Sequence, residues 1–205
     1  MEHIYSFYSP FYDFIFGSTL DQGRRIACRY IQNHRPIKVL EVGVGTGLTL
    51  GYYPKNCTIY GIDLSSKMLS KAEIRAKRLT NGNQVVLRVM DASNLEFPDN
   101  TFDAVISPYV ITTVTDPLCV CREMLRVCKP SGQIIVVNHT RSQKLIRGNL
   151  EKWFSPLFSR LGFATDMDVI HYLKESGIQI TDITDCNAFK LHKVIIGCKP
   201  PEERS

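Results

Sequence analysis

The amino-acid sequence predicts an α/β fold in which helices cover both faces of a mostly parallel sheet. Over residues 38–138, short apolar segments with strand character alternate with segments whose apolar residues recur at helical spacing. Such alternation is typical of parallel strands joined by right-handed helical crossovers. The last two strand-like segments have a connection too short for a helix, which predicts an antiparallel hairpin at one edge. A chain of 205 residues is expected to form a single domain.

The parallel part of the sheet is predicted from five segments rich in branched apolar residues. They are residues 38–44, 58–64, 84–90, 102–107 and 133–138. A glycine-rich loop closes the first strand and is expected to open the first helix. Ser65 or Ser66 caps a helix after the second strand, and a further helix starts at Asp116 and Pro117 and ends at residues 130–132. The sequence then predicts a helix at residues 166–176 and a closing hairpin whose two strands are residues 179–184 and 194–198.

Composition and charge restrict the classes of function. With 44% hydrophobic and 22% charged residues, the chain is not disordered throughout. Its apolar runs are far shorter than the roughly 18 residues of a membrane span, and its start lacks the pattern of a secretory signal, so we expect a cytoplasmic protein. The net charge of +5 is a weak attraction for phosphate groups, and no nucleic-acid-binding motif accompanies it. No metal-binding pattern is evident either.

The loop after the first strand is the main candidate for ligand binding. Gly43 and Gly45 allow backbone amides to approach a ligand, and Asp63, 18 residues after Gly45, is placed to accept hydrogen bonds from ribose hydroxyls. A dinucleotide loop would have glycine where this chain has Leu48. Glu41 would repel a diphosphate but suits a ligand with an amino group, which favours S-adenosylmethionine. A glycine-rich turn without a ligand is the alternative.

Asp91 and Ala92 end the third strand, where the carboxylate can accept from the adenine amino group; a turn cap is the alternative for Asp91. Together with the loop, the Gly61–Asp63 segment and residues 125–133, they resemble the successive motifs of class I S-adenosylmethionine-dependent methyltransferases over residues 37–140. The resemblance implies a Rossmann-like, seven-stranded sheet and S-adenosylmethionine as cofactor. The cofactor contacts that we expect in the core are Glu41, Gly43, Gly45, Asp63, Leu64, Met68, Asp91, Ala92 and Pro108.

Three further segments resemble the short bacterial phosphatidylethanolamine N-methyltransferases, which attach peripherally to membranes. They are the tyrosine-rich start at residues 5–17, the end of the fourth strand at 107–117, and residues 137–139, although Thr140 stands where that family would have an aromatic. The resemblance implies N-methylation of phosphatidylethanolamine, and of its mono- and dimethyl forms, towards phosphatidylcholine. It further implies that the protein attaches to the inner face of an anionic membrane. Tyr5 and Tyr12 are then secondary candidates for contact with the cofactor.

Two residues at strand ends are candidates for the chemistry. Tyr109 follows the fourth strand and is expected to orient the acceptor, while His139 ends the fifth strand at the edge where α/β sheets bind ligands. Either could assist the loss of a proton from the acceptor amine. The alternatives are a packing role for Tyr109 and a structural role for His139.

Two segments depart from the alternating pattern. Residues 3–17 contain seven aromatic side chains, and residues 141–163 form a basic, amphipathic insertion. In the insertion we expect contacts to a lipid phosphate and to the membrane interface, from Arg141, Lys144, Arg147, Trp153 and Phe154. Ordinary core-covering helices are the alternative. The single domain 1–205 is thus divided into four segments. They are an aromatic N-terminal helical segment (1–34), a cofactor-binding core (35–140), the insertion (141–163), and a C-terminal helix with hairpin (164–200).

Two rival functions remain open. One is methylation of a small soluble acceptor such as a quinone, thiol or amine, which needs no bilayer. The other is a cofactor-binding scaffold without activity that attaches to nucleic acid through its positive charge. Against the scaffold, the sequence shows neither a nucleic-acid module nor an array of aromatic residues for base stacking, so we expect no nucleic-acid partner.

Overall fold

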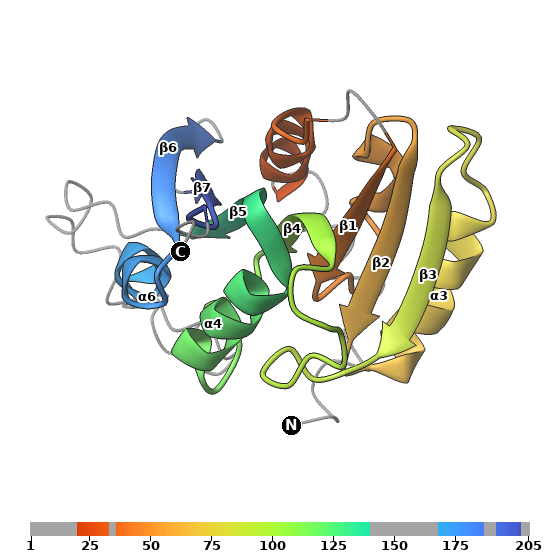
Figure 1. Ribbon diagram of the computed structural model, residues 1–205. Helices are drawn as coiled ribbons and strands as arrows, with labels where there is room; N and C mark the ends of the chain where they lie inside the picture. The colour runs from red at the N-terminus through yellow and green to blue at the C-terminus, as the bar shows by residue number, and fades with distance from the viewer. Residues whose placement is uncertain (1–19, 33–35, 140–167, 187–191, 202–205) are drawn as a thin grey trace, which may run out of the picture.

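A seven-stranded sheet forms the centre of the computed structural model, which describes residues 20–32, 36–139, 168–186 and 192–201 (Figure 1). The strand order is β3-β2-β1-β4-β5-β7-β6. The first five strands in this order, from β3 through β2, β1 and β4 to β5, pair in parallel. Strand β7 pairs antiparallel with both β5 and β6. The strands are β1 (Ile37–Val42), β2 (Cys57–Asp63), β3 (Gln84–Val89), β4 (Phe102–Pro108), β5 (Cys128–His139), β6 (Gln179–Cys186) and β7 (His192–Cys198). The predicted fold class, including the antiparallel hairpin, is confirmed.

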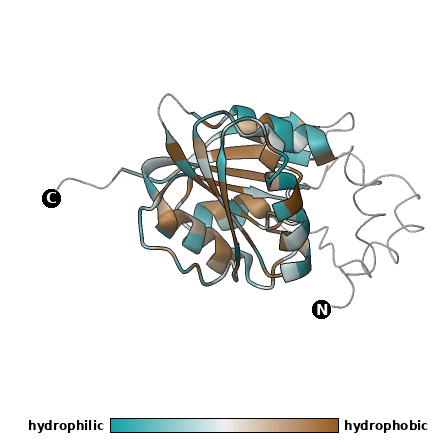
Figure 2. Ribbon diagram, turned by 90° about the vertical axis from the view of Figure 1, so that its right-hand side faces the viewer, coloured by the Kyte–Doolittle hydropathy of each residue, from teal (hydrophilic) through white to brown (hydrophobic). Residues whose placement is uncertain are grey.

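Helices cover the two faces of the sheet in separate groups. The helical residues 20–29 and α3 (Ser66–Ala76) pack against one face, where Ala27, Leu69 and Ala72 join a cluster of buried apolar residues. On the other face, α4 (Pro117–Val127) and α6 (Val169–Glu175) lie side by side and pack into a second cluster. Figure 2 shows mostly hydrophobic strands running between helices that carry both hydrophobic and hydrophilic residues.

Local capping fixes where the helices start. Ser65 accepts a hydrogen bond from the Met68 amide at the start of α3, and Asp116 accepts one from the Cys119 amide at the start of α4. The helix expected at residues 166–176 is α6, which begins three residues later because Asp168 caps it. Each cap satisfies an amide that lacks a partner within its helix.

Two local expectations are wrong. The glycine loop opens only a short 3-10 helix, η1 (Leu50–Tyr52), because Pro54 holds the preceding Tyr53 in an extended conformation and stops the turn. Residues 130–132 do not end α4, which stops at Val127 because the chain turns directly into β5 at Cys128. Cys128 pairs with Phe102, and Gln133 then pairs with Ala104, so the residues between them bulge out of the strand.

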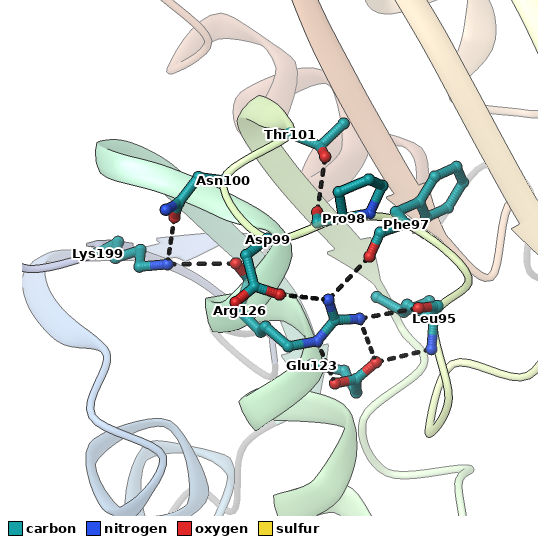
Figure 3. A network of polar contacts seen from close by, with 9 residues as sticks. All are labelled: Leu95, Phe97, Pro98, Asp99, Asn100, Thr101, Glu123, Arg126 and Lys199. Atoms are coloured by element: carbon teal, nitrogen blue, oxygen red, sulfur yellow. Dashed lines mark hydrogen bonds and ion pairs between the residues drawn. The ribbon is translucent and has the colours of Figure 1, made fainter.

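The loop between β3 and β4 is tied to α4 by one arginine (Figure 3). Arg126 donates to the carbonyl oxygens of Leu95 and Phe97, each over 2.8 Å, and to the Asp99 carboxylate over 2.7 Å. Both oxygens of Glu123 accept from the same guanidinium, and one of them also accepts from the Leu95 amide. Arg126 and Glu123 of α4 therefore hold the loop that enters β4 at several points.

Candidate active site

Gly43 and Gly45 shape the loop that leaves β1 at the carboxyl edge of the sheet. Their φ angles are +69° and +55°, a left-handed conformation that side chains with a Cβ atom adopt with strain. A Cβ atom added to Gly43 would lie 2.2 Å from a methyl carbon of Val110, whereas one added to Gly45 would meet nothing within 4 Å. The loop is thus packed tightly at Gly43 and faces open space at Gly45.

Asp63, the last residue of β2, joins this loop to the start of α3. Its Oδ2 accepts from the Gly45 amide and its Oδ1 from the Ser65 amide, both over 2.9 Å. Burial raises the pKa of this carboxyl group, and the two amides oppose the shift. Each carboxylate oxygen can accept a further hydrogen bond, so the group can also receive the hydroxyls of a diol.

Glu41 is a buried carboxyl group beneath the loop, with 1% of its surface exposed. The Tyr53 hydroxyl donates to it over 2.8 Å, and Thr49 donates a further hydrogen bond. Burial raises the pKa of Glu41 to about 7, although these two donors and the charge of Arg24 oppose the shift. The site therefore holds a carboxyl group whose ionised form lacks sufficient compensation in the cofactor-free protein.

Arg24 comes to the same edge from the helical residues 20–29. Only 8% of it is exposed, and its Nη1 is buried without a hydrogen-bond partner among the described residues. Its guanidinium lies over the Tyr109 ring, 5.4 Å from the ring centroid. Sequence reasoning missed Arg24 because nothing local distinguishes it from Arg25; only the packing of the helix shows that it is buried.

Apolar side chains stand exposed beside the loop. Leu64, directly after β2, is 67% exposed, and Val89, which ends the neighbouring β3, is 59% exposed. Met68 is half-buried on the first turn of α3. Asp91 is also exposed, and its Oδ1 accepts from both the amide and the hydroxyl of Ser93, which lowers the pKa of Asp91. The alternative role of Asp91 as a turn cap is thus present, and its expected place beside an adenine stays a prediction, as does that of the half-buried Ala92.

Tyr109 follows the buried Pro108 at the end of β4 and has a φ angle of +65°. Its amide donates to the Val137 carbonyl over 2.7 Å, and its hydroxyl donates to the Leu20 carbonyl over 2.9 Å. The ring packs edge-on against His192, with 5.5 Å between the ring centroids. Tyr109 is therefore held by β5, β7 and the helical residues 20–29 at once.

His192 begins β7 and pairs in register with His139, the last residue of β5. The structure places the backbone of His139 at the expected edge. His192 was missed because its strand was expected to start at residue 194. Counting back along the antiparallel register from Val194, which pairs with Val137, would have placed it opposite His139.

Seven of the predicted contact residues lie outside the described residues. They are Tyr5 and Tyr12 of the aromatic segment, and Arg141, Lys144, Arg147, Trp153 and Phe154 of the insertion. In the described part of the chain, no helix is long and apolar enough to cross a membrane.

The described groups fit S-adenosylmethionine. The glycine loop faces open space, Asp63 can receive the ribose hydroxyls, and the exposed Leu64 offers an apolar surface for the adenine ring. Glu41 can receive the ammonium group of the methionine part, which would supply the positive charge that the buried carboxylate needs. When bound, the cofactor supplies a methyl group on a positively charged sulfur.

Comparison with known proteins supports this assignment. Residues 40–136 match the family model described as "Methyltransferase domain". Phosphatidylethanolamine N-methyltransferase of Cereibacter sphaeroides is 35% identical over 173 residues, covering 84% of this chain and 85% of that protein. Demethylmenaquinone methyltransferase of Tropheryma whipplei (strain Twist) is 28% identical over 156 residues, covering 75% of this chain and 64% of that protein.

Solved structures share the fold at low sequence identity. A SAM-dependent methyltransferase from Aquifex aeolicus superposes with a TM-score of 0.68 at 18% identity, covering 89% of this chain and 93% of its own. The [4+2]-cyclase SpnF gives a TM-score of 0.70 at 20% identity, covering 87% of this chain and 80% of its own. Because the same fold carries different chemistry in these two proteins, the fold alone does not define the reaction.

The fold, the site and the sequence matches together define the class of protein: this chain belongs to the S-adenosylmethionine-dependent methyltransferases, and its cofactor is S-adenosylmethionine. Within that class it resembles the phosphatidylethanolamine N-methyltransferase of C. sphaeroides over most of the length of both proteins.

Proposed function

We propose that the protein methylates the amino group of phosphatidylethanolamine, and then its mono- and dimethyl forms, towards phosphatidylcholine. The observation that carries this proposal is the 35% identity to the C. sphaeroides phosphatidylethanolamine N-methyltransferase, which this chain matches over 85% of that protein's length. The chain's net charge of +5 favours an anionic membrane surface. The protein then works from the cytoplasm, attached peripherally to the inner face of the membrane.

Tyr109 is the residue that we propose to orient the acceptor amine. Its hydroxyl donates to the Leu20 carbonyl over 2.9 Å, and a phenol oxygen is chemically able to accept hydrogen bonds from N–H groups. An amine acceptor must lose a proton before its nitrogen can attack a carbon centre. An acceptor oxygen at Tyr109 would hold the N–H groups, and His139, at the end of β5, is proposed to take the proton.

The Tyr109→Phe and His139→Ala variants test these roles. His139→Ala is expected to lower kcat by roughly a hundred- to ten-thousandfold, the usual contribution of one positioned proton acceptor, and Tyr109→Phe is expected to lower kcat as well. In both variants the Kd for S-adenosylhomocysteine should change less than about threefold. Equal losses of kcat and cofactor affinity would assign both residues to the cofactor instead. Unchanged kcat in both variants would remove them from the chemistry.

The residues that follow His139 in the sequence are the ones that we propose to contact the lipid. Arg141, Lys144 and Arg147 are proposed to bind the lipid phosphate, and Trp153 and Phe154 to enter the membrane interface. Sedimentation with vesicles tests this part. Replacing the three basic residues by Gln should weaken binding to vesicles that contain an anionic lipid and leave cofactor binding intact. Equal binding of both proteins to these vesicles would contradict it.

The test of the activity is transfer of labelled methyl groups into vesicles. Purified protein, labelled S-adenosylmethionine and vesicles of phosphatidylethanolamine, with and without anionic lipid, are incubated, and the lipids are resolved by mass spectrometry. Label in mono-, di- and trimethylated lipid is the expected result. An Asp63→Ala variant, which loses the residue proposed to hold the ribose, is the matched inactive control. Binding of the cofactor without any methylated lipid would reject the proposal.

Methylation of a quinone is a second candidate, because the T. whipplei demethylmenaquinone methyltransferase is 28% identical over 75% of this chain. This chain spans 64% of that protein, compared with 85% of the phosphatidylethanolamine enzyme. The difference in coverage is why the lipid amine is the preferred acceptor here.

A further inference from the structure

A buried guanidinium group lies at the same edge of the sheet as the site and has no assigned role. Arg24 belongs to the helical residues 20–29, and the neighbouring Gly23 packs so closely on Tyr109 that an added Cβ would lie 2.3 Å from its hydroxyl oxygen. Tyr109 follows the end of β4, so this part of the helix covers the carboxyl edge. β4 is the direct neighbour of β1, where Glu41 pairs in register with Ile106.

Arg24 is incompletely satisfied in this position. It is 8% exposed, and among the residues that the structure describes its Nη1 has no hydrogen-bond partner. The face of its guanidinium contacts the Tyr109 ring, but a ring face accepts no N–H in the plane of the guanidinium. A buried, charged donor without an acceptor costs free energy that a bound anion would recover.

Arg24 and Glu41 carry opposite charges close to each other but are not joined by a salt bridge in the structure. The Arg24 charge lowers the pKa of Glu41, after the larger effects of burial and of the hydrogen bonds from Tyr53 and Thr49. The oxygens of Glu41 instead accept from Tyr53 and Thr49. A buried acidic group and a buried basic group at one sheet edge have the two charges needed for a ligand with an ammonium and a carboxylate on one carbon atom. The α-amino-acid end of the cofactor is such a ligand.

We infer that Arg24 binds the α-carboxylate of the methionine part of S-adenosylmethionine, while Glu41 binds its ammonium group. The pair thus recognises the zwitterion as a whole. The inference concerns the cofactor and is independent of the acceptor, so it stands whether the acceptor is a lipid amine or a quinone.

The test compares two ligands that differ only in the carboxylate. Binding of S-adenosylmethionine and of its decarboxylated analogue is measured by calorimetry without any acceptor, at pH 8.5, where Glu41 is ionised. The wild-type protein is expected to prefer the carboxylated ligand. Arg24→Gln should weaken binding of S-adenosylmethionine by roughly ten- to a hundredfold, the usual worth of a hydrogen bond to a charged group, and change the affinity for the analogue less than about threefold.

Arg25→Gln is the matched control, because Arg25 is the adjacent arginine, its side chain is 57% exposed, and it pairs with Asp21. It should keep the wild-type preference between the two ligands. Arg24→Lys retains the charge and is expected to keep part of the preference. If Arg24→Gln does not fold, the binding of the two ligands is compared in Arg24→Lys instead. A preference for the carboxylated ligand as large as that of the wild-type protein would then overturn the inference.

Two outcomes with Arg24→Gln would overturn the inference. An equal loss of affinity for both ligands would show that Arg24 merely supports Tyr109 and Glu41. Unchanged affinity for both, together with a higher KM for lipid vesicles, would assign Arg24 to the lipid phosphate. Failure of the phosphatidylethanolamine assay, by contrast, would leave the preference for the carboxylated cofactor unaffected.

Discussion

At the scale of single residues, the site contains a carboxyl group whose ionised form is disfavoured by burial. Glu41 is buried beneath the glycine loop, and burial raises the pKa of its side chain from 4.5 to about 7. Since folding favours the neutral form, the stability that Glu41 contributes is fully present below pH 4.5 and is lost as the pH rises through about 7. A bound ammonium group would reverse this preference by stabilising the ionised form.

Replacing Glu41 by Gln is expected to separate stability from binding. At pH 8 the variant should raise the free energy of unfolding of the cofactor-free protein by about 1–3 kcal/mol, because Gln is neutral and can still accept from Tyr53. At pH 5 the gain should almost vanish. Urea unfolding at the two pH values checks this. A variant that is destabilised equally at both would show that the neutral hydrogen bonds of Glu41, and not its ionisation, dominate.

The affinity for the cofactor should increase with pH, whereas the stability that Glu41 contributes decreases. The affinity of the wild-type protein for S-adenosylhomocysteine is expected to fall as the pH drops through about 7, because Glu41 takes up a proton there. The groups that act on Glu41 are Tyr53, Thr49, Arg24 and Asp63, and of these only Arg24 is cationic. Calorimetry across this pH range measures the affinity. The same dependence in Glu41→Gln would assign it to another group.

At the scale of elements, α4 organises the entry into β4. Arg126 sits in the last turn of α4 and bonds two loop carbonyls, Asp99 and Glu123, as Figure 3 shows. From the other side, Lys199 donates to the Asn100 side chain and to the Arg126 carbonyl. The network therefore fixes the start of β4, the strand whose other end leads to Tyr109.

Arg126→Ala should therefore lower the free energy of unfolding by about 1–3 kcal/mol, since it leaves part-buried carbonyls and the Glu123 carboxylate without their donor. Arg122→Ala, on an exposed position of the same helix, is the matched control and should change stability by less than about 0.5 kcal/mol. Denaturant unfolding of both variants makes the comparison. Equal effects would show that the network carries no more free energy than surface contacts do.

Elements also show where sequence reasoning succeeds and where it stops. The buried strands were predictable because apolar runs between turn residues identify them directly. The glycine loop was predicted to open a helix, and local chemistry at Pro54 prevents this. The start of β5 at Cys128 depends on pairing with Phe102, a contact that only the folded sheet provides.

At the scale of the whole molecule, the sheet brings separate strand ends to one edge. Glu41, Asp63 and Tyr109 lie at or just after the ends of β1, β2 and β4, and all three were predicted because parallel strands share their carboxyl edge. Arg24 and His192 complete the arrangement from a helix and an antiparallel strand. Neither carries a local motif, so their contribution depends on tertiary packing that the sequence pattern does not reveal.

The central claim is that this site delivers the methyl group to a lipid amine. The most direct measurement is a competition in which one set of vesicles contains equal amounts of phosphatidylethanolamine and demethylmenaquinone, with labelled S-adenosylmethionine and purified protein. Mass spectrometry of the extracted vesicles then reports both products from one reaction. We predict label in the methylated ethanolamine lipids and none above the Asp63→Ala background in the quinone. Label confined to the quinone would contradict the account and transfer the proposed function to quinone methylation.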